Sequence, residues 1–280
     1  THLVKEVFDP LLIRALLIHN AKYPANNSMS MTDKVTQMGF GAPSSVQEML
    51  YNSEDEITLI LRDTLEKGSF IEMFDFPFPE SLVDKDGNFV GQIIVTLVTK
   101  SLLDDKQAGE YCQSNIDILF GNYETETDRD TSKKGIKNPK GLEEPQNILL
   151  ESLYSARVKG AHPFTGFERE CTLVKYGKKF HPVKKYAIDL SEMTTSNRQR
   201  YLRGDRKWYL KIEGLYRDFI EQDARARNYQ LSQEYCLLLT IRDPNGKAPV
   251  YDEVAQQLDY KNFLHHNIQL RNVVTIDGTL

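Results

Sequence analysis

The sequence predicts a mixed α+β fold that is mainly β: an antiparallel β-sandwich of jelly-roll or fibronectin type, preceded by a short helical segment. Short segments rich in β-branched and aromatic residues recur from residue 57 onward, and turn signals separate them. Few helical patterns lie between these segments, whereas a parallel doubly wound sheet needs helices at regular intervals. The 280 residues are 40% hydrophobic and 27% charged, a globular balance that excludes wholesale disorder.

The first fifty residues have the pattern of helices. An N-capping acid, Asp9, is followed by a proline at the first helical position. Residues 11–21 are apolar on almost all sides, so we expect this helix to be buried on most of its surface. A polar loop rich in Asn, Ser and Met follows, and then a short helix over residues 46–52 that Ser44 or Ser45 can cap.

The remaining residues have mainly the periodicity of strands. Strands are expected over residues 57–63, 69–79, 91–100, 114–121, 185–190, 207–219, 234–244 and 268–276. Helices are expected over residues 147–158 and 251–265. The polar stretch near 124–146 has no apolar periodicity and is interpreted as a long exposed loop. We therefore divide the chain into a helical part, residues 1–55, and a β-sandwich domain, residues 56–280.

Composition restricts the possible partners and the compartment. The formal net charge of −5 argues against a general nucleic-acid binder, and no apolar run approaches the roughly 20 residues that span a bilayer. Cys112, Cys171 and Cys236 are scattered and form neither a disulfide framework nor a zinc signature. We expect Cys112 and Cys236 to be buried and unreactive, and the protein to be cytoplasmic, without nucleic-acid or membrane partners.

The chain carries no recognisable catalytic, cofactor or metal signature. The sequence lacks GxSxG, GxxxxGK[ST], GxGxxG after a strand, and HExxH. His19 lies inside the apolar helix, where a hydrogen-bonded core histidine is the favoured interpretation. We therefore assign no catalytic, cofactor-binding or metal-binding residue and expect no cofactor.

One basic segment, residues 197–209, is a candidate partner-binding site. It concentrates arginine and lysine around two tyrosines and the single tryptophan of the chain, a combination that can hold an anionic or extended partner by charge and stacking. The alternative is a basic loop that enters a strand and buries alternate residues. The candidate residues are Arg198, Arg200, Arg203, Arg206, Lys207 and Trp208.

A Gly-Phe-Gly sequence at residues 39–41 lies between the helical segments 12–21 and 46–50. These three elements resemble the end of the catalytic domain of subtilisin-like serine proteases, in which a G-[YF]-G turn joins a buried helix to a final short helix. The remainder of the chain resembles the C-terminal region of a bacterial subgroup of that family. Further matching segments are residues 76–82, 95–104, 110–121, the strand that begins at Trp208, and residues 236–244. The family's Asp, His and Ser motifs are absent from the chain and would lie upstream of Thr1, so no catalytic residue is carried over.

The resemblance implies the C-terminal portion of a serine endopeptidase, with a β-rich domain that is not catalytic by itself and that regulates the protease or positions a protein or peptide substrate. Its implied partners are the upstream catalytic domain and an AAA-type ATPase. An alternative is a stand-alone protein-interaction module, whose contacts would be residues 124–141 and 198–207. A carbohydrate-binding sandwich is a third class, which would need Phe164, Phe167 and Tyr176 to line a groove.

Overall fold

The structure is a computed structural model that describes residues 9–24, 29, 31–106, 111–124, 145–154, 182–260 and 266–267. Its helices are α1 (Pro10–His19), α2 (Met31–Met38), α3 (Val46–Leu50), α5 (Thr195–Tyr201), α6 (Asp218–Arg227) and α7 (Val250–Tyr260). Its strands are β1 (Glu56–Glu66), β2 (Phe70–Phe76), β3 (Gln92–Thr99), β4 (Ser114–Tyr123), β5 (Gln146–Asn147), β6 (Val183–Asp189), β7 (Lys207–Tyr216), β8 (Ser232–Arg242) and β9 (His266–Asn267). Short 3-10 turns occur at Glu80–Leu82, Glu151–Leu153 and Leu190–Glu192.

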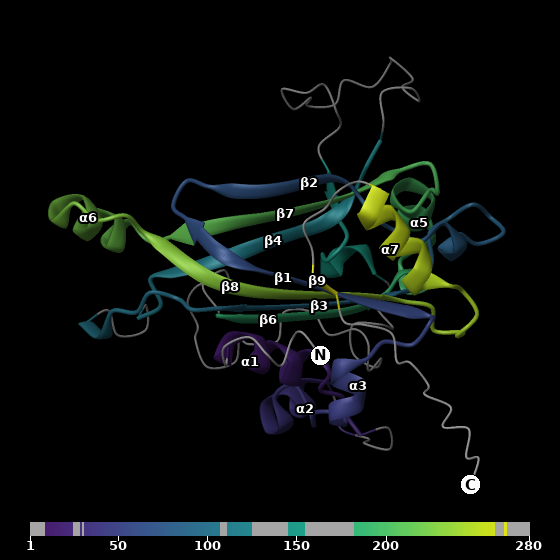
Figure 1. The fold of residues 1–280 in the computed structure, drawn as a ribbon, viewed down its shortest axis with the longest axis horizontal. Coiled ribbons are helices and arrows are strands. Elements are labelled where there is room, and N and C mark those ends of the chain that lie inside the picture. The colour runs from purple at the N-terminus through teal and green to yellow at the C-terminus, as the bar shows by residue number, and fades with distance from the viewer. Residues whose placement is uncertain are drawn as a thin grey trace, which may run out of the picture.

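Two antiparallel sheets pack face to face, which confirms the predicted sandwich (Figure 1). One sheet has five strands in the order β6-β3-β8-β1-β9, and the other has four in the order β2-β7-β4-β5. Strand β8 lies at the centre of the larger sheet, where Ile241 pairs with Ile57 of β1 on one side and with Ile93 of β3 on the other. The central strands come from distant parts of the sequence, so long-range pairing builds the sheet.

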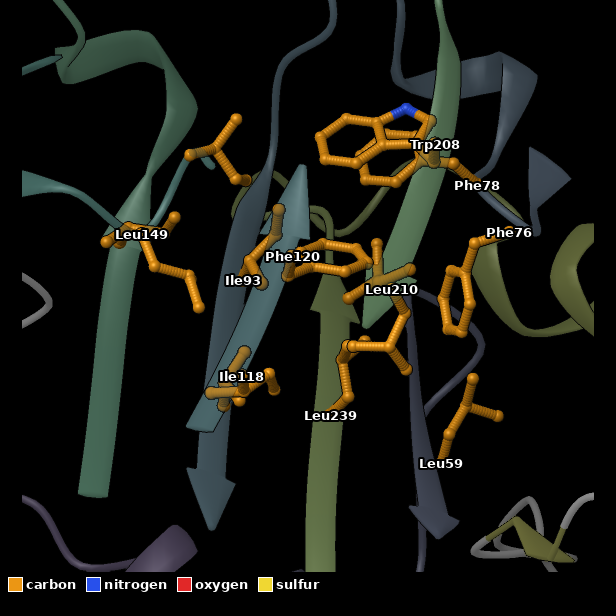
Figure 2. Packing of buried hydrophobic residues seen from close by; sticks show 14 of the residues in the cluster. Leu59, Phe76, Phe78, Ile93, Ile118, Phe120, Leu149, Trp208, Leu210 and Leu239 are labelled. Carbon is orange, nitrogen blue, oxygen red and sulfur yellow. The ribbon is translucent and has the colours of Figure 1, made fainter. Parts of the chain in front are cut away.

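The main core lies between the two sheets. Because side chains alternate along a strand, every second residue of β1, β3 and β8 points inward, and Leu59 and Leu239 are among those fully buried there. From the opposite sheet, Phe120 and Trp208 meet them, with Trp208 stacked on Phe78 at 4.1 Å between ring centroids (Figure 2).

A second, smaller core lies on the outer face of the five-stranded sheet, where α1 covers β3 and β8 (Figure 1). Leu12 and Ala15 of α1 pack against Val98, Cys236 and Leu238 of the sheet. As the sequence predicts, Asp9 caps α1 by accepting hydrogen bonds from the backbone N–H groups of the first turn.

Two neighbouring lysines in β6 bind opposite layers of the molecule. Lys184 points inward, and its Nζ lies 3.1 Å both from the carbonyl oxygen of Ile116 and from the Asp117 carboxylate on β4. Lys185 points outward, and its Nζ lies 2.8 Å from the carbonyl oxygen of Ile18 and 2.7 Å from that of Ala21. A buried ammonium thereby donates to the carbonyl oxygen of Ala21, just beyond the end of α1, and to that of Ile18, which also accepts from the Ala21 N–H at 3.2 Å.

Four local predictions need correction. Residues 31–38, interpreted as part of a polar loop, form α2, and residues 195–201, at the start of the basic segment, form α5. The segment that begins at 147 is not a helix where the structure describes it, because β5 pairs with β4 and a 3-10 turn follows. The strand expected over 207–219 ends at Tyr216, and α6 begins two residues later, at Asp218.

Two further predictions fall mostly on residues outside the described ranges: the loop near 124–146 and the strand at 268–276. The helix predicted at 251–265 is present as α7 up to Tyr260, after which the described residues stop until 266. Within the part of the chain that the structure describes, no helix combines the length and the apolar character needed to cross a lipid bilayer.

Candidate functional site

The basic segment that the sequence singles out is largely engaged with the protein itself. On α5, Arg198 forms an ion pair with Asp84 at 2.7 Å, and the Arg200 guanidinium lies 5.0 Å from the Tyr201 ring centroid. Arg203 binds the neighbouring Asp205 carboxylate with two nitrogen atoms.

The end of the same segment enters β7 and is partly buried. Trp208 is 2% exposed and belongs to the sandwich core, and Arg206 is 4% exposed. Arg206 donates to the Asn122 side chain at 2.7 Å and to the Glu124 carboxylate at 2.8 Å. Lys207 points outward and pairs with Asp75 at 3.3 Å. Arg200, Arg203 and Lys207 thus carry the exposed charge of this segment, while Arg206 and Trp208 serve the fold.

A cleft lies elsewhere in the described structure, between the helical layer and the outer face of the five-stranded sheet. It encloses about 1160 Å³. Its floor is the part of the sheet that α1 leaves uncovered, and its walls come from the C-terminal end of α1, from residues 45–56 and from residues 246–249 after β8. Three segments far apart in the sequence therefore meet around one cavity.

A buried hydrogen-bond network closes the α1 end of this cavity. His19 Nδ1 lies 2.9 Å from Thr96 Oγ1 on β3, and His19 Nε2 lies 2.7 Å from Thr240 Oγ1 on β8. Thr240 in turn contacts Thr58 Oγ1 at 2.6 Å. Burial, with a contribution from the Lys185 charge, lowers the pKa of His19 to about 3, so the imidazole is neutral. The sequence interpretation of His19 as a hydrogen-bonded core histidine is confirmed.

The charges around the cavity are unevenly satisfied. Lys22 pairs with Glu48 at 3.5 Å, and the Arg242 guanidinium donates to Gln92 Oε1 on the neighbouring strand. Glu56 lies at the start of β1 and makes no ion pair within the described ranges. Burial raises the pKa of its carboxyl group; Arg242 opposes this rise and Asp55 adds to it.

The described residues contain no cluster of His, Cys, Asp and Glu that could hold a metal ion. Cys112 and Cys236 are buried free thiols, as predicted, and burial raises the pKa of Cys236 to about 12. Such a thiol stays protonated at neutral pH and is a poor nucleophile. Cys171 lies outside the described residues, as do Phe164, Phe167 and Tyr176 of the carbohydrate hypothesis.

Sequence reasoning missed this cavity because its parts have no shared motif. The acidic run 54–56 has the composition of an ordinary turn before a strand. A single polar residue in an apolar strand, such as Thr240, does not by itself indicate a binding site. The alternation of side chains along β8 was a usable signal, because it places Thr240 and Arg242 on the face of the sheet opposite to the core residues Leu239 and Ile241.

Comparison with protein-family models finds no match to this chain, and comparison with curated protein sequences finds none either.

Proposed function

We propose that this chain is the C-terminal portion of a subtilisin-like serine endopeptidase, in which the β-sandwich is a non-catalytic domain that positions a protein or peptide substrate or regulates access to the protease. The support is the resemblance of α1, the Gly-Phe-Gly turn and α3 to the end of the family's catalytic domain. On this proposal the helices belong to the catalytic fold and the sandwich follows it.

One structural observation carries the proposal: α1 is fixed to the sheet along one face, and along another no described residue covers it. Lys185 and His19 hold its C-terminal end to β6, β3 and β8. Ile13 and Leu17, one helical turn apart, are nevertheless 41% and 42% exposed. A helix that is apolar on so many sides is stabilised by a second layer, and the catalytic domain of the same polypeptide is the layer that the proposal supplies.

The proposal assigns no reacting group to this chain. A general base must accept a proton near neutral pH, whereas both ring nitrogens of His19 contact threonine hydroxyls and its pKa is lowered to about 3. On this proposal the catalytic Asp, His and Ser belong to a segment that precedes Thr1. The proposal also includes the implied AAA-type ATPase partner and a cytoplasmic location, which the buried free thiols suit.

A fluorophosphonate probe tests this proposal. The polypeptide translated from the complete reading frame should be labelled stoichiometrically on a serine in a GTSxAxP motif upstream of Thr1, and residues 1–280 expressed alone should stay unlabelled. The protease proposal would be contradicted if the complete reading frame lacked that motif and its product were not labelled. Strong labelling of residues 1–280 would contradict the statement that the nucleophile lies outside them.

The alternative, a stand-alone interaction module, is favoured by the exposed charge of Arg200, Arg203 and Lys207. Its test is the replacement of Arg198, Arg200 and Arg203 by glutamate, followed by partner binding at low salt, where charge contacts are strongest. Loss of binding supports this module. Binding that survives the charge reversal excludes the basic segment as the contact.

A further inference from the structure

We infer that the cavity between the helical layer and the sheet is a binding site for an extended peptide segment, which places a lysine or arginine side chain beside Glu56 and Asp55. The inference concerns these 280 residues alone and does not depend on the presence of a catalytic domain.

The outer face of the five-stranded sheet has a covered half and an open half. Ile60, Val98 and Leu238 lie under α1 in the smaller core. Further along the same strands, Thr58 and Ile94 line the cavity instead. The open half is therefore a sheet surface that the rest of the described chain encloses without filling.

The size and chemistry of this cavity suit a peptide better than a small metabolite. Its volume of about 1160 Å³ lies above the range of roughly 300–1,000 Å³ that is typical of small-molecule pockets. Hydroxyl, amide and charged groups dominate its lining, and Ile94 is an apolar contact among them. Such a mixture suits an extended peptide, which presents main-chain N–H and C=O groups together with polar and apolar side chains.

Charge complementarity selects a basic side chain. Two of the three cations of the cavity already have acceptors, since Lys22 pairs with Glu48 and Arg242 binds Gln92, and Lys247 is the third. On the acidic side, Glu54, Asp55 and Glu56 are consecutive, and none of them has an ion-pair partner within 4 Å among the described residues, although the Arg242 and Lys22 charges act on Glu56 from further away. Glu56 is half-buried at the edge of the floor, and burial disfavours the charged form of its carboxyl group. An ammonium or guanidinium group beside it would stabilise the carboxylate.

The proposal is tested with residues 1–280 and three fluorescein-labelled peptides composed of valine, serine and one variable residue. The variable residue is lysine, glutamine or glutamate, and fluorescence anisotropy gives each Kd. We expect saturable binding of the lysine peptide, weaker binding of the glutamine peptide and the weakest binding of the glutamate peptide, because only the first brings the complementary charge.

Two variants place the binding in the cavity. Glu56→Gln keeps the shape of the side chain and removes its charge, and we expect it to weaken lysine-peptide binding on the order of tenfold. Glu54→Lys, at an exposed position, reverses a second charge of the acidic run and should also weaken lysine-peptide binding. The matched control is Glu234→Gln, which removes an exposed carboxylate that pairs with Lys100 outside the cavity and should leave the Kd unchanged.

Three results would overturn the inference. The first is the lack of saturable binding of the lysine peptide up to about 1 mM, which corresponds to a binding free energy near −4 kcal/mol. The second is equal or tighter binding of the glutamate peptide. The third is lysine-peptide binding that neither Glu56→Gln nor Glu54→Lys weakens, which would place the contact elsewhere. Because none of these measurements involves proteolysis, their failure is distinguishable from failure of the protease proposal.

Discussion

Lys184 and Lys185 are adjacent in β6 and bind opposite layers of the protein. Lys184 reaches across the sandwich to the backbone of Ile116, and Lys185 reaches outward to the carbonyl oxygens of Ile18 and Ala21. The two-residue period of a strand produces this division, because consecutive side chains point to opposite faces. A single edge strand therefore joins the two sheets to each other and the helical layer to the sheet.

Lys185→Met should loosen the helical layer while the sandwich stays folded. The substitution removes the ammonium that donates to the carbonyl oxygens of Ile18 in α1 and of Ala21 just beyond it, so we expect the free energy of unfolding to fall by about 1–3 kcal/mol in urea titrations. The matched control is Lys100→Met, which removes an exposed ion pair and should change stability by less than about 0.5 kcal/mol. Hydrogen exchange should accelerate at α1 and stay unchanged in β4 and β7. Equal stability of the two variants would contradict the anchoring role of Lys185.

His19 should make the protein less stable as the pH falls below neutrality. Its pKa is about 3 in the folded state and near 6.5 in the unfolded state, so between these values the unfolded chain binds more protons. The stability is fully present above pH 6.5 and is lost progressively as the pH falls toward 3. From pH 7 to pH 5 this one group should contribute a loss of about 2 kcal/mol. In His19→Gln this contribution should disappear from the pH dependence of unfolding, and an identical pH dependence in both proteins would refute the assignment.

Gly41 should tolerate alanine worse than Gly39 does, although both have positive φ. A Cβ on Gly41, at φ +95°, would lie 2.5 Å from the carbonyl oxygen of Lys22, which pairs with Ala42. A Cβ on Gly39, at φ +58°, would meet nothing within 4 Å. We expect Gly39→Ala to cost about 1 kcal/mol from backbone conformation and Gly41→Ala at least twice as much, measured by thermal unfolding. A smaller cost at Gly41 would show that the turn can adjust.

Trp208 should behave as a core residue and not as a partner contact. It stacks on Phe78, and its indole N–H makes no hydrogen bond within the described part of the chain. Trp208→Phe therefore loses contact area without breaking a hydrogen bond, whereas Trp208→Ala leaves a cavity and should cost about 3–5 kcal/mol. As the single tryptophan, it should show blue-shifted emission with little quenching by iodide. Strong quenching in the native protein would contradict its burial.

The sandwich and its strands were predictable because alternation and β-branched residues are local signals, as β3 and β8 show. The buried positions of Lys184, Lys185 and Arg206 were not predictable, because each depends on acceptors supplied by distant segments. The same reason explains why the internal ion pairs of the basic segment were not predicted. Its composition indicates a binding surface, but Asp84 and Glu124, which neutralise Arg198 and Arg206, come from elsewhere in the chain. The cavity too is assembled from three separate segments, so no window of sequence contains it.

We propose that the exposed face of α1 lies against a catalytic domain, and thiol labelling at Leu17 tests this proposal most directly. Leu17→Cys and, as a control, Leu103→Cys at a 64% exposed position are introduced both into residues 1–280 and into the product of the complete reading frame. Maleimide labelling of each site is followed by peptide mass spectrometry. The account predicts rapid labelling at both sites in residues 1–280, and protection of Leu17→Cys but not of Leu103→Cys in the complete protein. Equally rapid labelling of Leu17→Cys in both proteins would contradict it.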